Sequence, residues 1–174
     1  RSADEAWEEA QDIGLPVVIK PYDGNHGRGV TLNLMTENDV REAYELAARK
    51  GDSKSVIVER YITGDEHRVL IVGNKLVAAA KGESLWVTGD GQASVKQLVG
   101  TQINIDPRRG ETEEFPLGLI KPDESAEIIL ELKRQNMDAN SVPVAGQKVL
   151  IQPNGNVAID VTDLVHPEVA RVAA

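Results

Sequence analysis

The sequence has 174 residues and no cysteine. The absence of cysteine excludes a disulfide framework, a zinc site built from thiolates and a cysteine nucleophile. Aromatic residues are also scarce, at 3% of the chain, although 41% of it is hydrophobic. We therefore expect a core of aliphatic side chains. The chain is long enough for one domain or for two small lobes that share a cleft.

Positive charge and long apolar runs are in short supply as well. The 19 Lys and Arg residues face 28 Asp and Glu residues, which gives a net charge of −9. A nucleic-acid-binding domain usually shows a basic patch, so we expect no nucleic-acid partner. No hydrophobic run approaches the roughly 18 residues of a membrane span, and no signal peptide is visible. We expect a cytoplasmic protein without a membrane partner.

The hydrophobic pattern alternates between helical and strand periods. Many short strands are joined by turns, which predicts an α+β fold with largely antiparallel sheets. Helices are expected over residues 2–13, 37–50, 94–99 and 125–135, and strands over residues 17–19, 30–34, 56–62, 67–72 and 76–81. Residues 101–122 read as a long polar loop of open role. A last hairpin is expected from strands 149–151 and 157–161 around a turn at 153–155, before a helix that starts at 167.

A glycine-rich segment follows the first predicted strand. The strand delivers Lys20, and the loop after it contains Gly24, Asn25, His26, Gly27, Arg28 and Gly29. The spacing is neither that of a dinucleotide-binding fingerprint nor that of a Walker loop. Glycines still let backbone N–H groups approach an anion, and the basic side chains add donors, so the segment favours phosphate. The alternative is a hairpin loop beside a solvent-exposed lysine.

A second polar segment ends the strand over residues 56–62. Glu59 is suited to accept from an adenine amino group, and the backbone near Arg60 and Ile62 to pair with the purine edge. Glu66 is suited to hold ribose hydroxyls. Arg68, on the next strand, is suited to stabilise charge on a transferring phosphoryl group. The alternative is a charged hairpin edge whose surface ion pairs contribute little.

Together, the two segments resemble the ATP-grasp superfamily, whose members clamp ATP between two antiparallel sheets. The resemblance implies two α+β lobes, residues 1–62 and residues 63–174, the second incomplete at its C-terminal end. It makes Lys20 a phosphate ligand, residues 24–29 a flexible loop over the phosphates, and Arg68 a catalytic residue near an acyl phosphate. His26, in the loop, is a second catalytic candidate. The implied cofactors are ATP and Mg²⁺.

Later segments narrow the resemblance. Residues 78–81 and 87–91 are similar to bifunctional glutathione synthetases and cyanophycin synthetases, and residues 104–110 and 160–167 resemble the cyanophycin synthetase family. This likeness implies a ligase that adds aspartate to a growing aspartate–arginine polymer through an acyl phosphate, in a homo-oligomeric parent enzyme. The alternatives are another ATP-grasp peptide ligase of glutathione synthetase type and a non-catalytic nucleotide-binding module.

A metal site is not predicted within the chain. The superfamily places a Glu-x-Asn pair near the end of the fold, and the sequence has no such pair there. Asp160 and Asp163 are acidic neighbours, with His166 nearby, but aspartates are also common in turns. We expect the magnesium ligands beyond residue 174, and because the sequence begins with Arg1 we expect a piece of a longer protein, impaired or inactive alone. Arg108 and Arg109 are suited either to an anionic ligand or to a solvated loop.

Overall fold

The computed structural model describes residues 2–24 and 27–173, and for residues 154–156 the backbone alone. The chain forms two compact units. Arg1–Ile62 and Trp86–Gln152 make up the first unit, and Thr63–Leu85 and Pro153–Ala174 make up the second. The predicted lobes share the boundary at residue 62 with these units but not the grouping of residues 86–152. That two lobes clamp a nucleotide stays a prediction.

The first unit begins with an antiparallel sheet and two helices, as the pattern predicts. Side chains of Ser2 and Thr36 cap the two helices by accepting backbone N–H groups of the first turn. The sheet has the strand order β2-β1-β3. In chain order the elements are α1 (Ala3–Ile13), β1 (Val17–Pro21), β2 (Thr31–Leu34), α2 (Glu37–Lys50) and β3 (Val56–Arg60).

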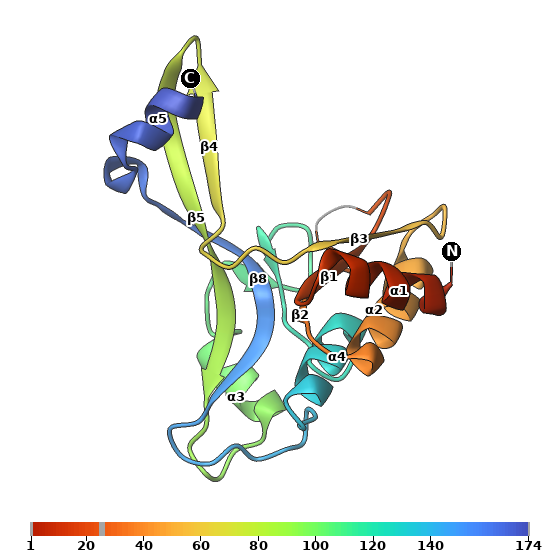
Figure 1. The fold of residues 1–174 in the computed structure, drawn as a ribbon. Helices are drawn as coiled ribbons and strands as arrows, with labels where there is room; N and C mark the ends of the chain where they lie inside the picture. Colours follow the sequence, from red (N-terminus) through yellow and green to blue (C-terminus); the bar gives the residue numbers. More distant parts are fainter. Residues whose placement is uncertain (1, 25–26, 174) are drawn as a thin grey trace. The chain divides into compact units, whose positions relative to one another are not determined.

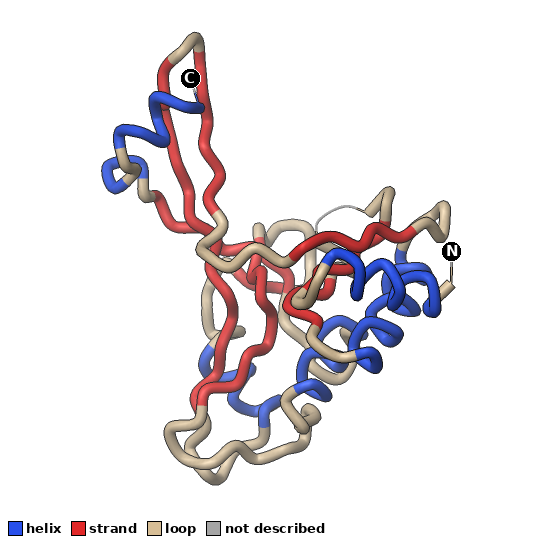
Figure 2. The backbone as a smooth tube through the Cα atoms, viewed as in Figure 1, coloured by secondary structure: helices blue, strands red, loops and turns tan. Residues whose placement is uncertain are grey.

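One face of this sheet packs against the two helices, as Figures 1 and 2 let the reader follow. The buried core consists of small and branched aliphatic side chains: Ala6, Ala10, Val17, Ile19, Leu34, Val40, Ala43 and Ala47. Since successive strand residues point to opposite faces, Val18 and Lys20 lie on the face away from this core. The packing of the helices therefore decides which face presents the lysine.

The rest of the first unit is more ordered than the predicted polar loop over residues 101–122. The helix before it reaches Gln102, and two short parallel strands lie within it. Asn104 exchanges two hydrogen bonds of 2.9 Å with the backbone of Ile120. These internal bonds organise a segment whose polarity alone suggested a loop. The elements are α3 (Val95–Gln102), β6 (Arg109–Gly110), β7 (Leu117–Gly118) and α4 (Ala126–Arg134).

The second unit contains the predicted hairpin of β4 (His67–Val72) and β5 (Lys75–Thr88). Gly73 and Asn74 form its turn, both with positive φ. β8 (Lys148–Asp160) neighbours β5, and the sheet order is β4-β5-β8. Residues 86–88 of β5 and 148–152 of β8 belong to the first unit. A 3-10 turn, η1 (Thr162–Leu164), and the helix α5 (Pro167–Ala173) follow.

The predicted hairpin at the end of the chain is wrong. β8 runs through residues 153–155 without a turn and is 13 residues long, because its neighbour β5 has 14 residues and offers partners along its length. Pro153 lacks an N–H group, but β8 is an edge strand, where proline is tolerated. The carbonyl of Pro153 accepts from the Ser84 hydroxyl at 2.7 Å.

None of the helices in the described part of the chain is long and apolar enough to cross a membrane.

Candidate functional site

Lys20 and Glu59 lie side by side on the sheet face away from α1 and α2. In the antiparallel register Glu59 faces Val18, two residues before Lys20, so the two charged side chains share one face. The Lys20 Nζ and Glu59 Oε1 atoms are 2.8 Å apart, and the side chains are 35% and 46% exposed. An ion pair this exposed adds little stability. Both groups therefore remain accessible to a ligand.

Pro21 forms the base of the glycine-rich loop. A Cβ added at Gly24, Gly29 or Gly51 would lie 2.9–3.1 Å from the Pro21 ring. Gly29 also has a φ of 71°, which side chains rarely adopt. Gly27 and Arg28 are exposed. The predicted site residues Asn25 and His26 lie outside the described residues.

Asp23 fixes the start of this loop. Its carboxylate accepts the backbone N–H groups of Asp52 and Ser53 at 3.1 and 2.8 Å. The hydrogen bonds from Ser53 hold the pKa of Asp23 below its ordinary value. The loop is thus tied at its first residues to the turn that follows α2.

Glu127, on α4, contacts the other end of the loop, a contact that no motif in the sequence predicted. Its Oε1 accepts the Gly29 N–H at 3.2 Å and lies 3.2 Å from the Nζ of Lys50. Partial burial acts to raise the pKa of Glu127, but its own backbone N–H, Lys50 and Ser125 outweigh that effect and lower it. The sequence signal was only an acidic residue in the first turn of a capped helix.

Arg60 and Ile62 have different surroundings. The Arg60 guanidinium donates to the carbonyl of Ile13, at the end of α1, at 2.8 Å. This hydrogen bond holds the Arg60 side chain away from Lys20, the partner of Glu59. The N–H of Tyr61 donates to the carbonyl of Pro16 at 3.0 Å. The Ile62 side chain is 75% exposed. Ile62 is thus an apolar surface close in sequence to Glu59.

Glu66 and Arg68 belong to the second unit. The Arg68 Nε lies 3.4 Å from the Glu66 Oε1, and both side chains are mostly exposed. Asp65 pairs with Lys81 at 2.7 Å, and this lysine lowers the pKa of Asp65. The structure therefore brings Lys20 together with Glu59 in one unit, and Glu66 together with Arg68 in the other.

The acidic residues near the C-terminus do not form a metal centre. The Asp160 carboxylate accepts from the hydroxyl and the N–H of Thr162 at 2.6 and 2.9 Å, and these bonds lower its pKa. The same hydroxyl accepts from the N–H of Ala79 at 3.0 Å. Across residues 2–24 and 27–173, no group of three acidic, His or Cys side chains could hold a metal ion. Asp160 acts here as a turn residue.

Arg108 and Arg109 each have a partner within the chain. The Arg108 guanidinium contacts Asp106 at 2.6 Å and lowers the pKa of that carboxyl to about 2. Arg109 is buried and donates to the carbonyl of Gly118 at 2.9 Å. The exposed Arg108 matches the alternative of a solvated loop, whereas the burial of Arg109 departs from it.

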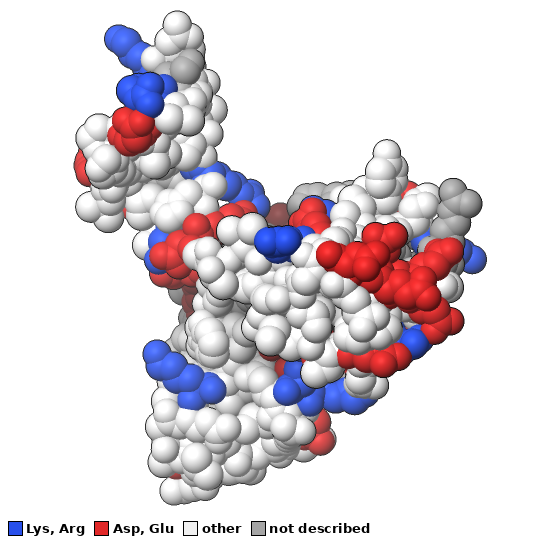
Figure 3. Space-filling model, viewed as in Figure 1, with Lys and Arg blue, Asp and Glu red and all other residues white. Residues whose placement is uncertain are grey.

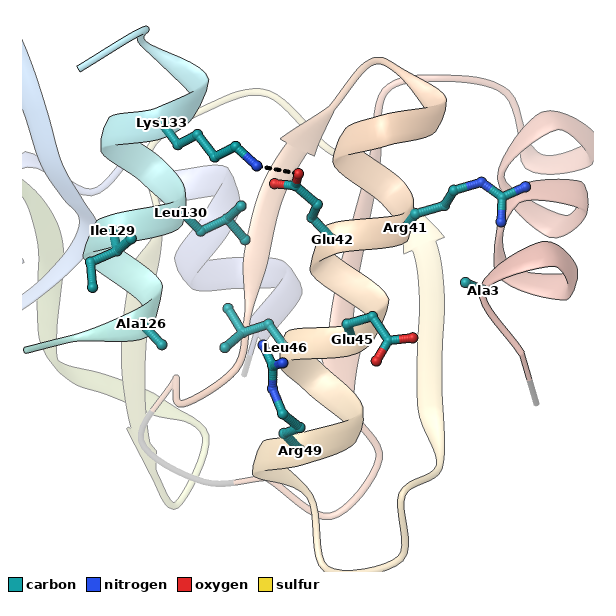
Figure 4. Close-up of a pocket in the computed structure, with 10 residues that line it drawn as sticks. All are labelled: Ala3, Arg41, Glu42, Glu45, Leu46, Arg49, Ala126, Ile129, Leu130 and Lys133. Atoms are coloured by element: carbon teal, nitrogen blue, oxygen red, sulfur yellow. Dashed lines mark hydrogen bonds and ion pairs between the residues drawn. The ribbon is translucent and has the colours of Figure 1, made fainter. Parts of the chain in front are cut away.

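A groove of about 490 Å³ lies between α2 and α4, and Figure 4 shows Leu46 and Leu130 facing each other in it. Lys133 reaches across it to pair with Glu42. The residues that line it are Ala3, Arg41, Glu42, Glu45, Leu46, Arg49, Ala126, Ile129, Leu130 and Lys133. Neither Lys20 nor Glu59 is among them, so the groove is a separate feature from the lysine–glutamate pair.

Acidic side chains gather over α1 on the face of the first unit that Figure 3 shows. This helix contains the run Asp4, Glu5, Glu8, Glu9 and Asp12. Arg41 of α2 meets this run by pairing with Asp4 at 2.6 Å. The acidic surface therefore lies over the helices, and the lysine–glutamate pair lies on the other face of the sheet.

An antiparallel α+β chain with a lysine–glutamate pair beside a glycine-rich loop has the architecture expected of an ATP-grasp domain. The family model described as "Carbamoyl-phosphate synthase L chain, ATP binding domain" matches residues 1–108, more than half of the chain. The chain therefore belongs to this ATP-grasp family, and the predicted fold class is confirmed.

Several relatives agree with the narrower resemblance. The cyanophycin synthetase of Synechocystis sp. is 42% identical over 95% of this chain, and the match covers 19% of that protein. The glutathione biosynthesis bifunctional protein GshAB of Clostridium perfringens is 34% identical over 90% of this chain and 20% of its own length. The chain thus spans about a fifth of the length of these relatives. The predicted resemblance to cyanophycin synthetases is confirmed.

Among solved structures, the bifunctional glutathione synthetase from Pasteurella multocida aligns with a TM-score of 0.50 and 31% identity. The alignment covers 99% of this chain and 24% of that protein. The similarity extends over both units of the chain.

Proposed function

We propose that this chain is the ATP-binding part of an ATP-dependent carboxylate–amine ligase. Family membership supports nucleotide binding. The observation that carries the proposal is the Lys20–Glu59 pair, half-exposed on the sheet face away from the helices and next to the glycine-rich loop. A pair that adds little stability but joins a donor and an acceptor at a loop base is suited to a ligand that offers both.

Lys20 and Glu59 would divide the nucleotide between them. The ammonium of Lys20 is a compact charge for a phosphate oxygen, and Glu59 is an acceptor for the amino group of adenine. Without nucleotide each neutralises the other at 2.8 Å. Bound ATP would replace both halves of the pair, so neither group is left uncompensated. The exposed Ile62 would offer an apolar surface to the purine.

The glycine-rich loop would supply further donors to the phosphates. Gly24 and Gly27 permit a close approach of the backbone, and Arg28 adds a charge. Gly29 as a phosphate contact stays a prediction from the sequence, because its N–H donates to Glu127. Asn25 as a phosphate contact and His26 as a catalytic residue stay predictions from the sequence. The same holds for the Arg60 backbone at the purine edge and for Glu66 at the ribose.

The proposed reaction has two steps. A peptide carboxylate oxygen bonds to the γ-phosphorus as the bond from that phosphorus to the β–γ bridging oxygen breaks, which gives an acyl phosphate and ADP. An amine then bonds to the acyl carbon, loses a proton, and inorganic phosphate leaves. The protein contributes position and positive charge. Arg68 is the proposed charge for the transferring phosphoryl group. Mg²⁺ would accompany ATP and offset phosphate charge, with no ligand assigned among the described residues.

The substrates we propose are aspartate and a growing aspartate–arginine polymer, in a homo-oligomeric, cytoplasmic parent protein. The 42% identity to a cyanophycin synthetase supports this choice. A peptide ligase of glutathione synthetase type is the second candidate, supported by the 34% identical relative and the solved structure. Aspartate-dependent ATP hydrolysis by the parent protein separates the two. Nucleotide binding with no turnover would instead indicate a non-catalytic module.

Calorimetric titration with a non-hydrolysable ATP analogue and Mg²⁺ tests the nucleotide site. Lys20→Ala and Glu59→Ala should each weaken binding by about 1.5–3 kcal/mol, the scale of a charge-assisted hydrogen bond. Lys96→Ala is the matched control, because Lys96, on α3, forms an exposed ion pair with Asp123. If the folded protein binds no analogue, or both variants bind as the control does, the proposal fails.

A further inference from the structure

Glu127 is not among the residues proposed to contact the nucleotide, yet its side chain connects α4 with α2 and with the glycine-rich loop. It belongs to α4, it pairs with Lys50 at the end of α2, and it accepts the N–H of Gly29. Its other oxygen accepts from the Ser125 hydroxyl at 3.1 Å. The Glu127 side chain is 21% exposed. A carboxylate with this many partners is held in one orientation.

Gly29 is the point where the glycine-rich loop returns to β2. The Val30 N–H donates to the carbonyl of Gly27 at 3.3 Å, which closes a tight turn before the strand. At Gly29 an added Cβ would lie 2.9 Å from both Pro21 and the Lys50 side chain. The backbone of Gly29 is thus pressed between the strand end and α2, with its N–H aimed at Glu127. The position of this end of the loop depends on those contacts.

We propose that Glu127 is a positioning residue for the phosphate part of the nucleotide. By holding the Gly29 N–H and the Lys50 ammonium with one carboxylate oxygen, it fixes the C-terminal base of the glycine-rich loop against α2 and α4. This proposal rests on the proposed nucleotide site. Glu127 itself contacts no nucleotide in this account and acts through the loop.

The proposal predicts an effect that depends on the ligand. The adenine contacts proposed for Glu59 and Ile62 lie on β3 and just after it, and none of the hydrogen bonds of Glu127 reaches them. Loss of the Glu127 carboxylate should therefore weaken the binding of a ligand with phosphates and leave the binding of a nucleoside unchanged. A general loss of structure would weaken both.

The experiment compares a non-hydrolysable ATP analogue with adenosine as ligands of the same chain. Glu127→Ala should bind the analogue about tenfold more weakly, the scale of one lost hydrogen bond to a charged group, with adenosine affinity unchanged. Glu127→Gln keeps an oxygen for Gly29 but loses the charge opposite Lys50, so a smaller loss is expected. Lys50→Met, which keeps the carbons packed on Gly29, should match Glu127→Gln. Glu124→Gln, an exposed position near the start of α4, is the control.

A second readout does not require nucleotide. Amide hydrogen exchange at Gly29 should accelerate in Glu127→Ala and stay unchanged in Glu124→Gln. Equal losses for the analogue and adenosine, or undisturbed analogue binding in Glu127→Ala, would overturn the positioning role. If the unaltered protein binds neither ligand, the nucleotide site itself is refuted and the role of Glu127 with it, an outcome visible before any variant is made.

Discussion

The pKa of one carboxyl, that of Asp106, determines how the stability of the segment over residues 104–110 depends on acidic pH. Asp106 accepts from the backbone and the guanidinium of Arg108, and these bonds lower its pKa from 3.8 to about 2. A carboxyl whose pKa falls on folding stabilises the folded state above its ordinary pKa. That contribution is complete above about pH 4 and is lost as the pH falls through about 2.

The Asp106 titration is a direct prediction. Its carboxyl signal in a nuclear magnetic resonance titration should have a midpoint near pH 2. Arg108→Gln should move the midpoint upward, toward 3.8, because the charged donor is removed. Asp106→Asn identifies the signal. A midpoint that Arg108→Gln leaves in place would show that Arg108 is not the cause.

Two loop glycines with the same backbone conformation should respond differently to a methyl group. Gly27 and Gly29 have φ angles of 73° and 71°, but of the two only the Cβ at Gly29 would meet atoms of the described residues within 4 Å. Gly27→Ala should cost about 1–2 kcal/mol of unfolding free energy from the backbone alone. Gly29→Ala should cost about 1–3 kcal/mol more, because its Cβ overpacks against Pro21 and Lys50. Urea unfolding measures both, and equal losses would contradict the packing assigned to Gly29.

For single residues, the sequence identifies a candidate side chain more readily than the partner that this side chain contacts in the fold. Lys20 and Glu59 were singled out separately, and their pairing follows once β1 and β3 are set in register. Glu127 could not be found in this way, since its link to Gly29 joins residues 98 positions apart through the packing of α4. Arg109 is similar: its burial depends on a carbonyl in β7.

Elements with strong local signals were predicted well. α1, α2 and α4 begin at capping side chains, and α1 and α2 each carry a buried stripe at helical spacing. The last hairpin was predicted from Pro153 and the glycine after it, but pairing with the long β5 overrides that turn signal. Strand pairing between distant segments is the information that local patterns lack.

α4 offers a matched test of its packing. Leu132 is fully buried, while Ile129, on the rim of the groove in Figure 4, is 48% exposed. Leu132→Ala should cost about 2–5 kcal/mol, because it removes buried methyl groups and leaves a cavity. Ile129→Ala should cost under about 1 kcal/mol. Thermal or urea unfolding gives both values, and a loss at Ile129 as large as that at Leu132 would contradict this difference in packing.

At the scale of the whole molecule, the two units differ in their cores. Most of the buried aliphatic side chains belong to the first unit. Of the described side chains in the second unit, Ala79 and Val161 are the buried hydrophobic ones, while Leu70, Val72 and Leu164 are exposed. Few buried apolar contacts imply low local stability.

Limited trypsin digestion should reveal this difference. We expect cuts after Arg68, Lys75 or Arg171 in the second unit before any cut within α2 or α4, because cleavage follows local opening. Mass spectrometry of the early fragments identifies the sites. Early cleavage at Arg41 or Arg49, within α2, would contradict the stability order.

Amide hydrogen exchange with and without a non-hydrolysable ATP analogue decides whether ATP binds beside the Lys20–Glu59 pair. We predict slower exchange over residues 17–24, 27–30 and 56–62, with residues 41–46 and 129–133 along the groove unchanged. Protection confined to the groove, or none in these strands despite measured binding, would contradict this prediction.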